Sequence, residues 1–219
     1  MRLVIIGLMM LFVVSCKQTP NKIVTMQEDV AVLASDEMGG RQTGTPGELL
    51  AAAYITERFS DIGLTPKGSE GNFTQTFSFT PSANPHEQSE FTNIQEDGSV
   101  TGTNVIGYIN NNAATTVIIG AHYDHLGMGG EGSLDREKPA IHNGADDNAS
   151  GIAILLALAD KLKNQSPTIT QNNYLFMAFS GEEMGFQIPD LQKIDLFHGR
   201  SPFLSLSYRG RSRHGIHRP

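Results

Sequence analysis

Three short segments of the sequence concentrate side chains that can bind a metal ion or move a proton. They read IIGAHYDH at 118–125, NGADDNASG at 143–151 and FSGEEMG at 179–185. Each segment follows an apolar run or opens a helical pattern, and ligands of open α/β sheets gather at the carboxyl ends of strands. We therefore expect the three segments to converge on one site.

The residue types in these segments favour metal-assisted hydrolysis. Histidine together with aspartate and glutamate is a ligand set that suits zinc without thiolates, and the chain has one cysteine. In the His-x-Asp pair, Asp124 can hold the His122 ring in one tautomer. The adjacent Glu182 and Glu183 offer one metal ligand and one free base, which could take the proton of a metal-acidified water.

Each segment alone also has a structural explanation. A single histidine at a strand end is more often structural than a ligand, and Asp-Asp-Asn before a helix is usually an N-cap. Glu-Glu in a loop is usually solvated charge. The three segments together, in this order and beside apolar structure, favour a functional site.

The rest of the chain predicts the elements that would position these segments. Helices are predicted over 26–35, from a capping box at 45–48 to Gly63, and over 151–162, and strands over 73–79, 103–109, 115–119 and 173–179. The three asparagines at 110–112 predict a hairpin between the strands at 103–109 and 115–119. The continuous apolar run at 173–179 predicts a strand buried on both faces. The alternation predicts an α/β fold with a mixed β-sheet sandwiched by helices.

Composition and the N-terminus restrict the protein's class and location. A net charge of −7 argues against nucleic-acid binding, and one cysteine excludes an internal disulfide framework. Residues 1–15 have a positive start and an apolar stretch, which predicts a lipoprotein signal peptide, and the following Cys16 completes a stretch that resembles a bacterial lipobox. We expect lipidation at Cys16, a tether over 16–24, and a lipid anchor in the bacterial cell envelope, facing the periplasm or the exterior. An ordinary signal peptide is the alternative.

Together with further motifs, the three segments resemble metallopeptidase family 28, the co-catalytic zinc aminopeptidases of the bacterial leucyl aminopeptidase and aminopeptidase Y type. The further motifs are LASDEMGGR at 33–41, GTPG at 44–47 and NVIG at 104–107. The resemblance covers roughly residues 25–186. It implies a zinc-exopeptidase-like fold, peptide substrates and two zinc ions per site.

The resemblance also implies a role for each motif residue. His122 would bind one zinc and Glu183 the other, and Asp146 would bridge both. Asp124 would orient His122, and Glu182 would be the general base and acid.

Three neighbouring residues have no ligand role in that pattern. We interpret His125 as a residue that contacts a metal ligand without binding the metal itself. Asp147 is interpreted as structural and His142 as a loop residue.

The resemblance breaks after Gly185. The family has two more ligands, an aspartate in a later strand and a histidine near the C-terminus, whereas residues 187–219 hold six basic and two acidic residues in no clear period. We expect an incomplete zinc peptidase domain over 25–186, without its C-terminal strands and helices. The atypical basic tail over 187–219 is interpreted as a frameshift product or as a genuine interaction element. Because ligands would be missing, we expect weak zinc binding and no aminopeptidase turnover.

The sequence thus favours a zinc-dependent aminopeptidase that hydrolyses N-terminal residues from peptides. Two alternatives stay open. One is an inactive fragment with partial metal binding, and the other is an acyltransferase that resembles glutaminyl cyclases, which share the fold and ligand order.

Overall fold

The computed structural model of the protein describes residues 24–81, 90–91, 98–129, 133, 139–165, 170–185 and 203–205. The predicted signal peptide, Cys16 and most of the tail at 187–219 lie outside these residues. Among the helices that the structure describes, none is long and apolar enough to cross a membrane.

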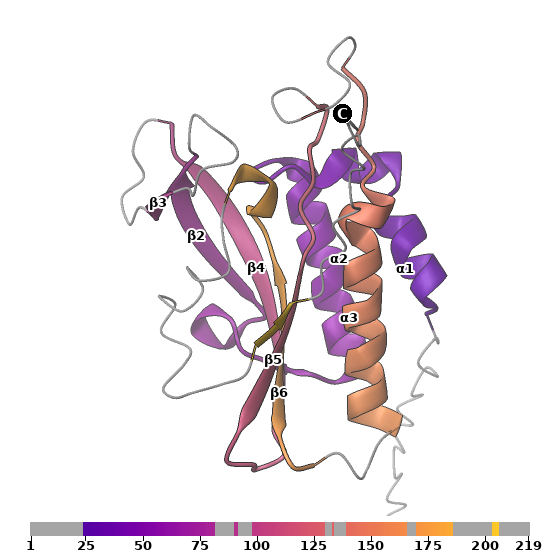
Figure 1. The fold of residues 1–219 in the computed structure, drawn as a ribbon, viewed down its shortest axis with the longest axis vertical. Helices are drawn as coiled ribbons and strands as arrows, with labels where there is room; N and C mark the ends of the chain where they lie inside the picture. The colour runs from indigo at the N-terminus through magenta and orange to yellow at the C-terminus, as the bar shows by residue number, and fades with distance from the viewer. Residues whose placement is uncertain are drawn as a thin grey trace, which may run out of the picture.

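In the described part of the chain, seven strands form one mixed sheet (Figure 1). The strands are β1 (Thr65–Pro66), β2 (Thr74–Thr80), β3 (Glu90–Phe91), β4 (Val100–Ile109), β5 (Thr116–His122), β6 (Asn173–Phe179) and β7 (Phe203–Ser205). Their order is β3-β2-β4-β6-β5-β7, and β1 also pairs with β4. β5 runs parallel to both β6 and β7, and the other pairs are antiparallel. The mixed α/β class predicted from the sequence is confirmed.

The predicted hairpin between β4 and β5 is wrong, because β6 lies between these two strands. Every residue of β6 is buried, so this strand is stabilised by neighbours on both edges. The Asn173 side chain at its start accepts hydrogen bonds from the backbone N–H groups of Asn111 and Ala113 and donates one to the Ala113 carbonyl. The asparagine-rich connection therefore wraps the start of β6 rather than folding β5 back onto β4.

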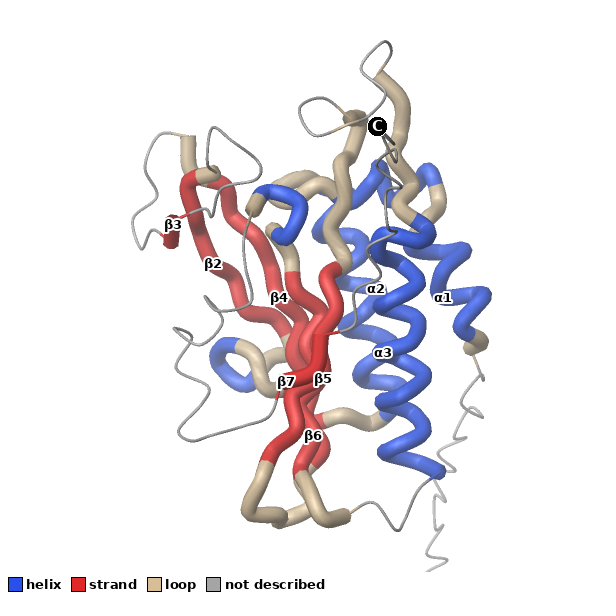
Figure 2. Tube along the Cα trace, in the orientation of Figure 1, coloured by secondary structure: helices blue, strands red, loops and turns tan. Residues whose placement is uncertain are grey.

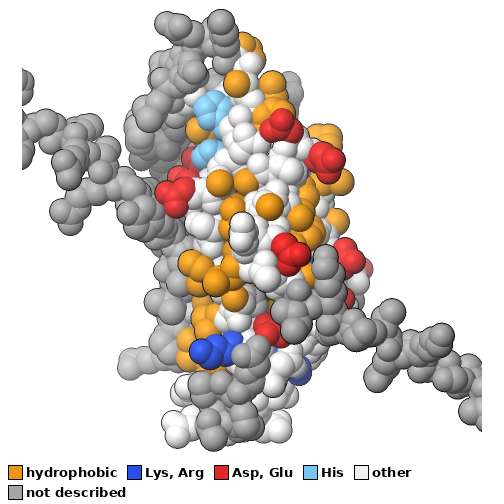
Figure 3. All heavy atoms as spheres, turned by 90° about the vertical axis from the view of Figure 1, so that its right-hand side faces the viewer, with side chains coloured by type: hydrophobic (Ala, Val, Ile, Leu, Met, Phe, Trp, Pro, Cys, Tyr) orange, Lys and Arg blue, Asp and Glu red, His pale blue; other side chains and the backbone are white. Residues whose placement is uncertain are grey.

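Three α-helices lie on the same side of the sheet in Figure 1 and Figure 2: α1 (Met26–Leu33), α2 (Pro46–Ile62) and α3 (Ser150–Asp160). The predicted ends of α2 are confirmed, since Thr45 Oγ1 accepts from the Glu48 N–H and Gly63 adopts the left-handed conformation that ends the helix. Short helical turns are η1 (Asp36–Arg41), η2 (Ser69–Gly71), η3 (Ala145–Ala149), η4 (Lys161–Gln165) and η5 (Glu182–Met184). Figure 3 shows that the outer face of the helices mixes acidic with scattered apolar side chains.

Side chains alternate between two apolar clusters on opposite faces of the sheet. Phe176 and Ala178 of β6 pack with the helices, whereas Leu175 and Met177 belong to the cluster on the other face. This alternation confirms that β6 is buried on both faces, as the continuous apolar run predicted. The rigid central strands fix the ends at which the candidate site lies.

Candidate metal centre

The three chemistry-bearing segments meet at one end of the sheet. β5 ends at His122 and β6 at Phe179, and these two residues are register partners in the parallel pair. The Glu182–Met184 turn follows β6 directly, and the loop with Asp146 and Asp147 runs into α3. Parallel pairing therefore brings the two strand ends together, and the packing of α3 against β5 adds the third segment.

His122 occupies the buried centre of this site. Its Nε2 atom lies 3.0 Å from Asp147 Oδ1 and 3.9 Å from Glu182 Oε2. On the other side of the ring, Nδ1 lies 3.2 Å from the Asp124 carbonyl oxygen and 3.5 Å from Asp124 Oδ1. Asp124 thus contacts the ring nitrogen that faces away from the other carboxylates, as an orienting residue would.

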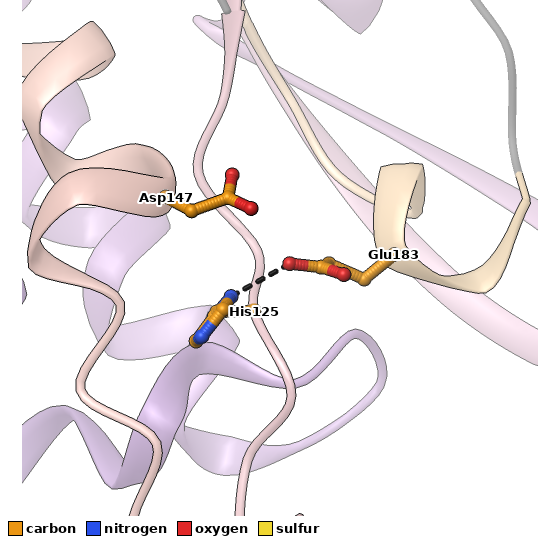
Figure 4. A group of neighbouring side chains, drawn as sticks. All are labelled: His125, Asp147 and Glu183. Atoms are coloured by element: carbon orange, nitrogen blue, oxygen red, sulfur yellow. Dashed lines mark hydrogen bonds and ion pairs between the residues drawn. The ribbon is translucent and has the colours of Figure 1, made fainter. Parts of the chain in front are cut away.

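A second imidazole stands beside the first. His125 Nδ1 lies 2.6 Å from Glu183 Oε1, and one ligand atom each from His125, Asp147 and Glu183 lie within 4.8 Å of one another (Figure 4). The three side chains come from three different segments and point toward a common centre. His125, to which sequence reasoning gave only a supporting place, is therefore part of the group.

The structure does not bring Asp146 into the group. Asp146 is exposed, and its carbonyl oxygen accepts a hydrogen bond from Ser150 Oγ at the start of α3. The neighbouring Asp147 instead directs its carboxylate at His122, although sequence reasoning gave Asp147 a structural role. Of the two adjacent aspartates, Asp147 is the one that the structure places in contact with His122, and nothing in the local sequence distinguishes it from Asp146.

The carboxylate of Asp124 also holds the turn that carries both glutamates. Asp124 Oδ1 accepts from the Glu182 N–H at 3.3 Å, and Oδ2 accepts from the Glu183 N–H at 3.2 Å. Asp124 is fully buried. One side chain therefore contacts the His122 ring and the backbone that presents Glu182 and Glu183.

Arg41 is a residue of the site region whose function sequence reasoning missed. Its guanidinium is fully buried and donates to the carbonyl oxygens of Leu33, Tyr123, Asn143 and Gly144. These carbonyls belong to the end of α1, the segment after β5 and the loop before the aspartates. Arg41 thus ties two of the three site segments together, and its position in a glycine-rich turn was the only sequence signal.

The charges around these groups shift their proton affinities. Burial lowers the pKa of Arg41 to about 10, although the carboxylates of Asp124, Asp147 and Glu183 oppose that shift. Burial also acts to lower the pKa of His122, but hydrogen bonds to Asp124 and Asp147 outweigh it and raise the pKa to about 10.

Glu182 has the proton affinity that suits a base in this place. Burial raises its pKa above the ordinary value for a glutamate, while His122 acts in the opposite direction. A carboxylate with a raised pKa accepts a proton more readily, and Glu182 stands within 3.9 Å of the His122 ring nitrogen.

The donor set fits zinc. Two imidazoles and several carboxylates converge without a thiolate, and zinc is bound by histidine nitrogens and carboxylate oxygens. His122, Asp147, His125 and Glu183 are the side chains that could hold it. Four carboxylates close together also repel one another unless a cation lies among them.

Comparison with known proteins decides the family. Residues 104–187, which contain all three segments, match the model of peptidase family M28. This region of the chain belongs to peptidase family M28. Over 147 residues, the chain is 34% identical to the alkaline phosphatase isozyme conversion protein of Escherichia coli K12, covering 67% of this chain and 39% of that protein.

Solved structures share the fold of the chain. A glutaminyl cyclase from Fimbriiglobus ruber matches with a TM-score of 0.56 and 22% identity, over 77% of this chain and 48% of that one. A Zn-dependent exopeptidase from Parabacteroides distasonis matches with a TM-score of 0.51 and 18% identity, over 75% of this chain and 48% of that one. The chain therefore spans less than half the length of these three relatives, and the two structures bear on the fold alone.

Proposed function

We propose that this M28 site serves a zinc-dependent aminopeptidase that hydrolyses N-terminal residues from peptides. The observation that carries the proposal is the convergence of His122, Asp147 and Glu182, with Nε2 of the ring within 3.9 Å of both carboxylates. It combines side chains that could bind a metal with a partly buried carboxylate that can accept a proton. Membership in a peptidase family supports hydrolysis of a peptide bond as the reaction.

His122, Asp147, His125 and Glu183 would hold zinc in this mechanism. When bound, zinc lowers the pKa of a water and polarises the scissile carbonyl. Glu182 would accept the proton of the attacking water, which its raised pKa favours, and would then return that proton to the departing amine. Asp124 keeps the His122 ring oriented through Nδ1.

The test measures zinc content and two products on the same preparation. Purified chain is analysed for metal, then incubated with aminoacyl p-nitroanilides and with a peptide that begins with glutamine. Zinc together with release of the N-terminal residue supports the aminopeptidase. Zinc-free protein, or zinc-loaded protein without release of that residue, contradicts the proposal for this chain.

Two other functions are distinguished by the same test. The fold match to the Fimbriiglobus ruber glutaminyl cyclase favours cyclisation of N-terminal glutamine as a second candidate. Formation of pyroglutamate without release of a residue would support it. Partial zinc binding with neither product would support the inactive fragment that the basic tail suggested.

We also propose that Cys16 carries a lipid anchor in the bacterial envelope, because it closes the lipobox-like stretch after the apolar N-terminus. Cys16→Ala is expected to move the protein from the membrane pellet to the soluble fraction of fractionated cells. Mass spectrometry of the mature N-terminus provides the check. Cleavage at another residue, or an unmodified Cys16 in the mature protein, would contradict the anchor.

A further inference from the structure

A buried threonine outside the three segments touches two of them. Thr43 lies in the turn before α2, is 3% exposed and contacts the buried side chains of Asp124 and Ser180. Its Oγ1 lies 3.1 Å from Asp124 Oδ2 and 3.0 Å from Ser180 Oγ. The same oxygen lies 3.1 Å from the Gly181 nitrogen. One hydroxyl therefore contacts the segment after β5 and the turn after β6.

Counting protons fixes the direction of two of these hydrogen bonds. A hydroxyl has one proton and two lone pairs, and a carboxylate can only accept. The proton of Thr43 therefore goes to Asp124, and one of its lone pairs accepts from the Gly181 N–H. The contact with Ser180 has no fixed direction, because the Ser180 hydroxyl also hydrogen-bonds the Glu48 carboxylate.

The directions define a chain of buried contacts that ends at the two glutamates. Thr43 donates to Asp124, and Asp124 accepts from the N–H groups of Glu182 and Glu183. Thr43 also holds the preceding Gly181, whose left-handed backbone directs the chain into this turn. Three consecutive N–H groups are thus bound by Thr43 and Asp124.

We propose that Thr43 is a positioning residue of the site: its hydroxyl fixes Asp124 and the turn at 181–183, so that Glu182 and Glu183 face the two histidines. The part that concerns zinc rests on the proposed function. The part that concerns the turn does not, because it follows from the hydrogen bonds alone.

Amide hydrogen exchange, followed by NMR on the full metal-free chain, tests the turn. Thr43→Val keeps the shape and removes the hydroxyl. We expect exchange of the Gly181, Glu182 and Glu183 N–H groups to rise about tenfold or more, since a lost hydrogen bond in a charged group is worth at least that factor. The N–H groups of Phe176 and Met177 in β6 should be unchanged.

Two further variants complete the design. Thr43→Ser keeps the hydroxyl and is expected to restore slow exchange in the turn. Thr101→Val, the same substitution at an exposed position of β4, is expected to leave the turn unchanged. Unchanged exchange in Thr43→Val, an equal rise in β6, or failure of Thr43→Ser to restore protection would overturn the proposal.

Zinc titration provides the second measurement. Thr43→Val is expected to weaken zinc binding about 10–100-fold, the range found when residues that orient metal ligands are lost. Unchanged affinity in Thr43→Val would overturn the positioning role. If the wild-type chain binds no zinc, the proposed function fails, while the exchange measurement still decides the role of Thr43 in the turn.

Discussion

Two clusters of charged side chains in this protein differ in how their charges balance. In the first, Asp29 of α1 accepts from Arg58 Nε at 2.8 Å and from the Tyr54 hydroxyl at 2.7 Å, both on α2. One acid meets one base and one neutral donor. This cluster joins two helices and is complete within the chain.

The second cluster is the candidate metal centre, where acids outnumber bases. Asp124, Asp147, Glu182 and Glu183 surround two imidazoles, and the buried guanidinium of Arg41 donates to carbonyl oxygens rather than to these carboxylates. Asp124 is fully buried, whereas the Asp147 side chain is 54% exposed and the Glu182 side chain is 31% exposed. Carboxylates held close together repel one another, and a cation among them would remove that repulsion. The comparison therefore sets a balanced cluster that joins two helices against an acidic cluster that a cation would balance.

The largest expected effect concerns the carboxylate assigned to proton transfer. In a frame-restored protein that carries the family's two remaining ligands, Glu182→Gln is expected to lower aminopeptidase turnover by about 10²–10⁴-fold while zinc binding stays close to that of the parent protein, because only the proton transfer is removed. Steady-state kinetics and metal analysis on the same zinc-loaded samples measure both. Near-normal turnover in Glu182→Gln would remove Glu182 from the mechanism.

A substitution in the balanced cluster should instead change the free energy of unfolding. Asp29→Ala leaves a buried guanidinium and phenol without their acceptor and is expected to cost about 3–5 kcal/mol in the free energy of unfolding. Urea denaturation of the metal-free chain gives the value, and Glu57→Ala at an exposed position of α2, next to Arg58, should change it by less than about 0.5 kcal/mol. A large loss of zinc affinity in Asp29→Ala at temperatures where it is folded would contradict the separation of the clusters.

Adjacent aspartates provide a matched pair inside the acidic cluster. Asp147→Asn is expected to weaken zinc binding about 10–100-fold or more, while Asp146→Asn should change it less than about twofold, since only Asp147 faces His122. Isothermal titration of both variants decides between them. The reverse order would restore the bridging role that the sequence resemblance gave to Asp146.

The last expected effect is a dependence on pH. Because neutral imidazole binds zinc and the pKa of His122 is raised to about 10, binding releases a proton, and affinity should rise up to about tenfold per pH unit from pH 6 to 8. In the metal-free chain the effect of pH has the opposite sign, because the stability of the fold decreases as pH rises. Stability from protonated His122 is complete below its unfolded pKa of about 6.5 and is lost as pH rises through about 10.

Titration with zinc at several pH values and urea denaturation in chelator check these two slopes. His122→Asn should flatten both of them. A zinc affinity that is independent of pH in the wild-type chain would mean that His122 is not the group that loses the proton.

Features with local causes could be predicted from the sequence. Thr45 and Gly63 delimit α2 because caps act within a few residues, and the apolar run of β6 predicted its burial on both faces. The predicted β4–β5 hairpin was wrong because β6 inserts between these two strands. That pairing is set by the burial of a strand far along the sequence, which a local turn signal does not report.

The residues of the candidate site likewise include some that the sequence predicts and some that only the structure reveals. Residue types and order predicted which segments carry chemistry, and the structure brings those segments together. The choice of Asp147 over Asp146 depends on the backbone path of one turn. The contacts of Arg41 and Thr43 reach partners about 80–140 residues away, so no pattern in the surrounding sequence could show them.

The buried side chains of the segment before and at the start of α2 also bear on how the protein can be divided. Glu48 accepts from the Thr103 N–H and the Tyr123 hydroxyl, so it joins Arg41 in crossing from this segment to β4 and to the residue that follows β5. A fragment that began at residue 104 would lack Thr103 itself and would leave the Tyr123 hydroxyl without Glu48 and the Tyr123 carbonyl without Arg41. The residue at which the family match begins is therefore not the start of a unit that folds cooperatively by itself. Any recombination between relatives that separates the two parts would have to exchange these contacts as a set.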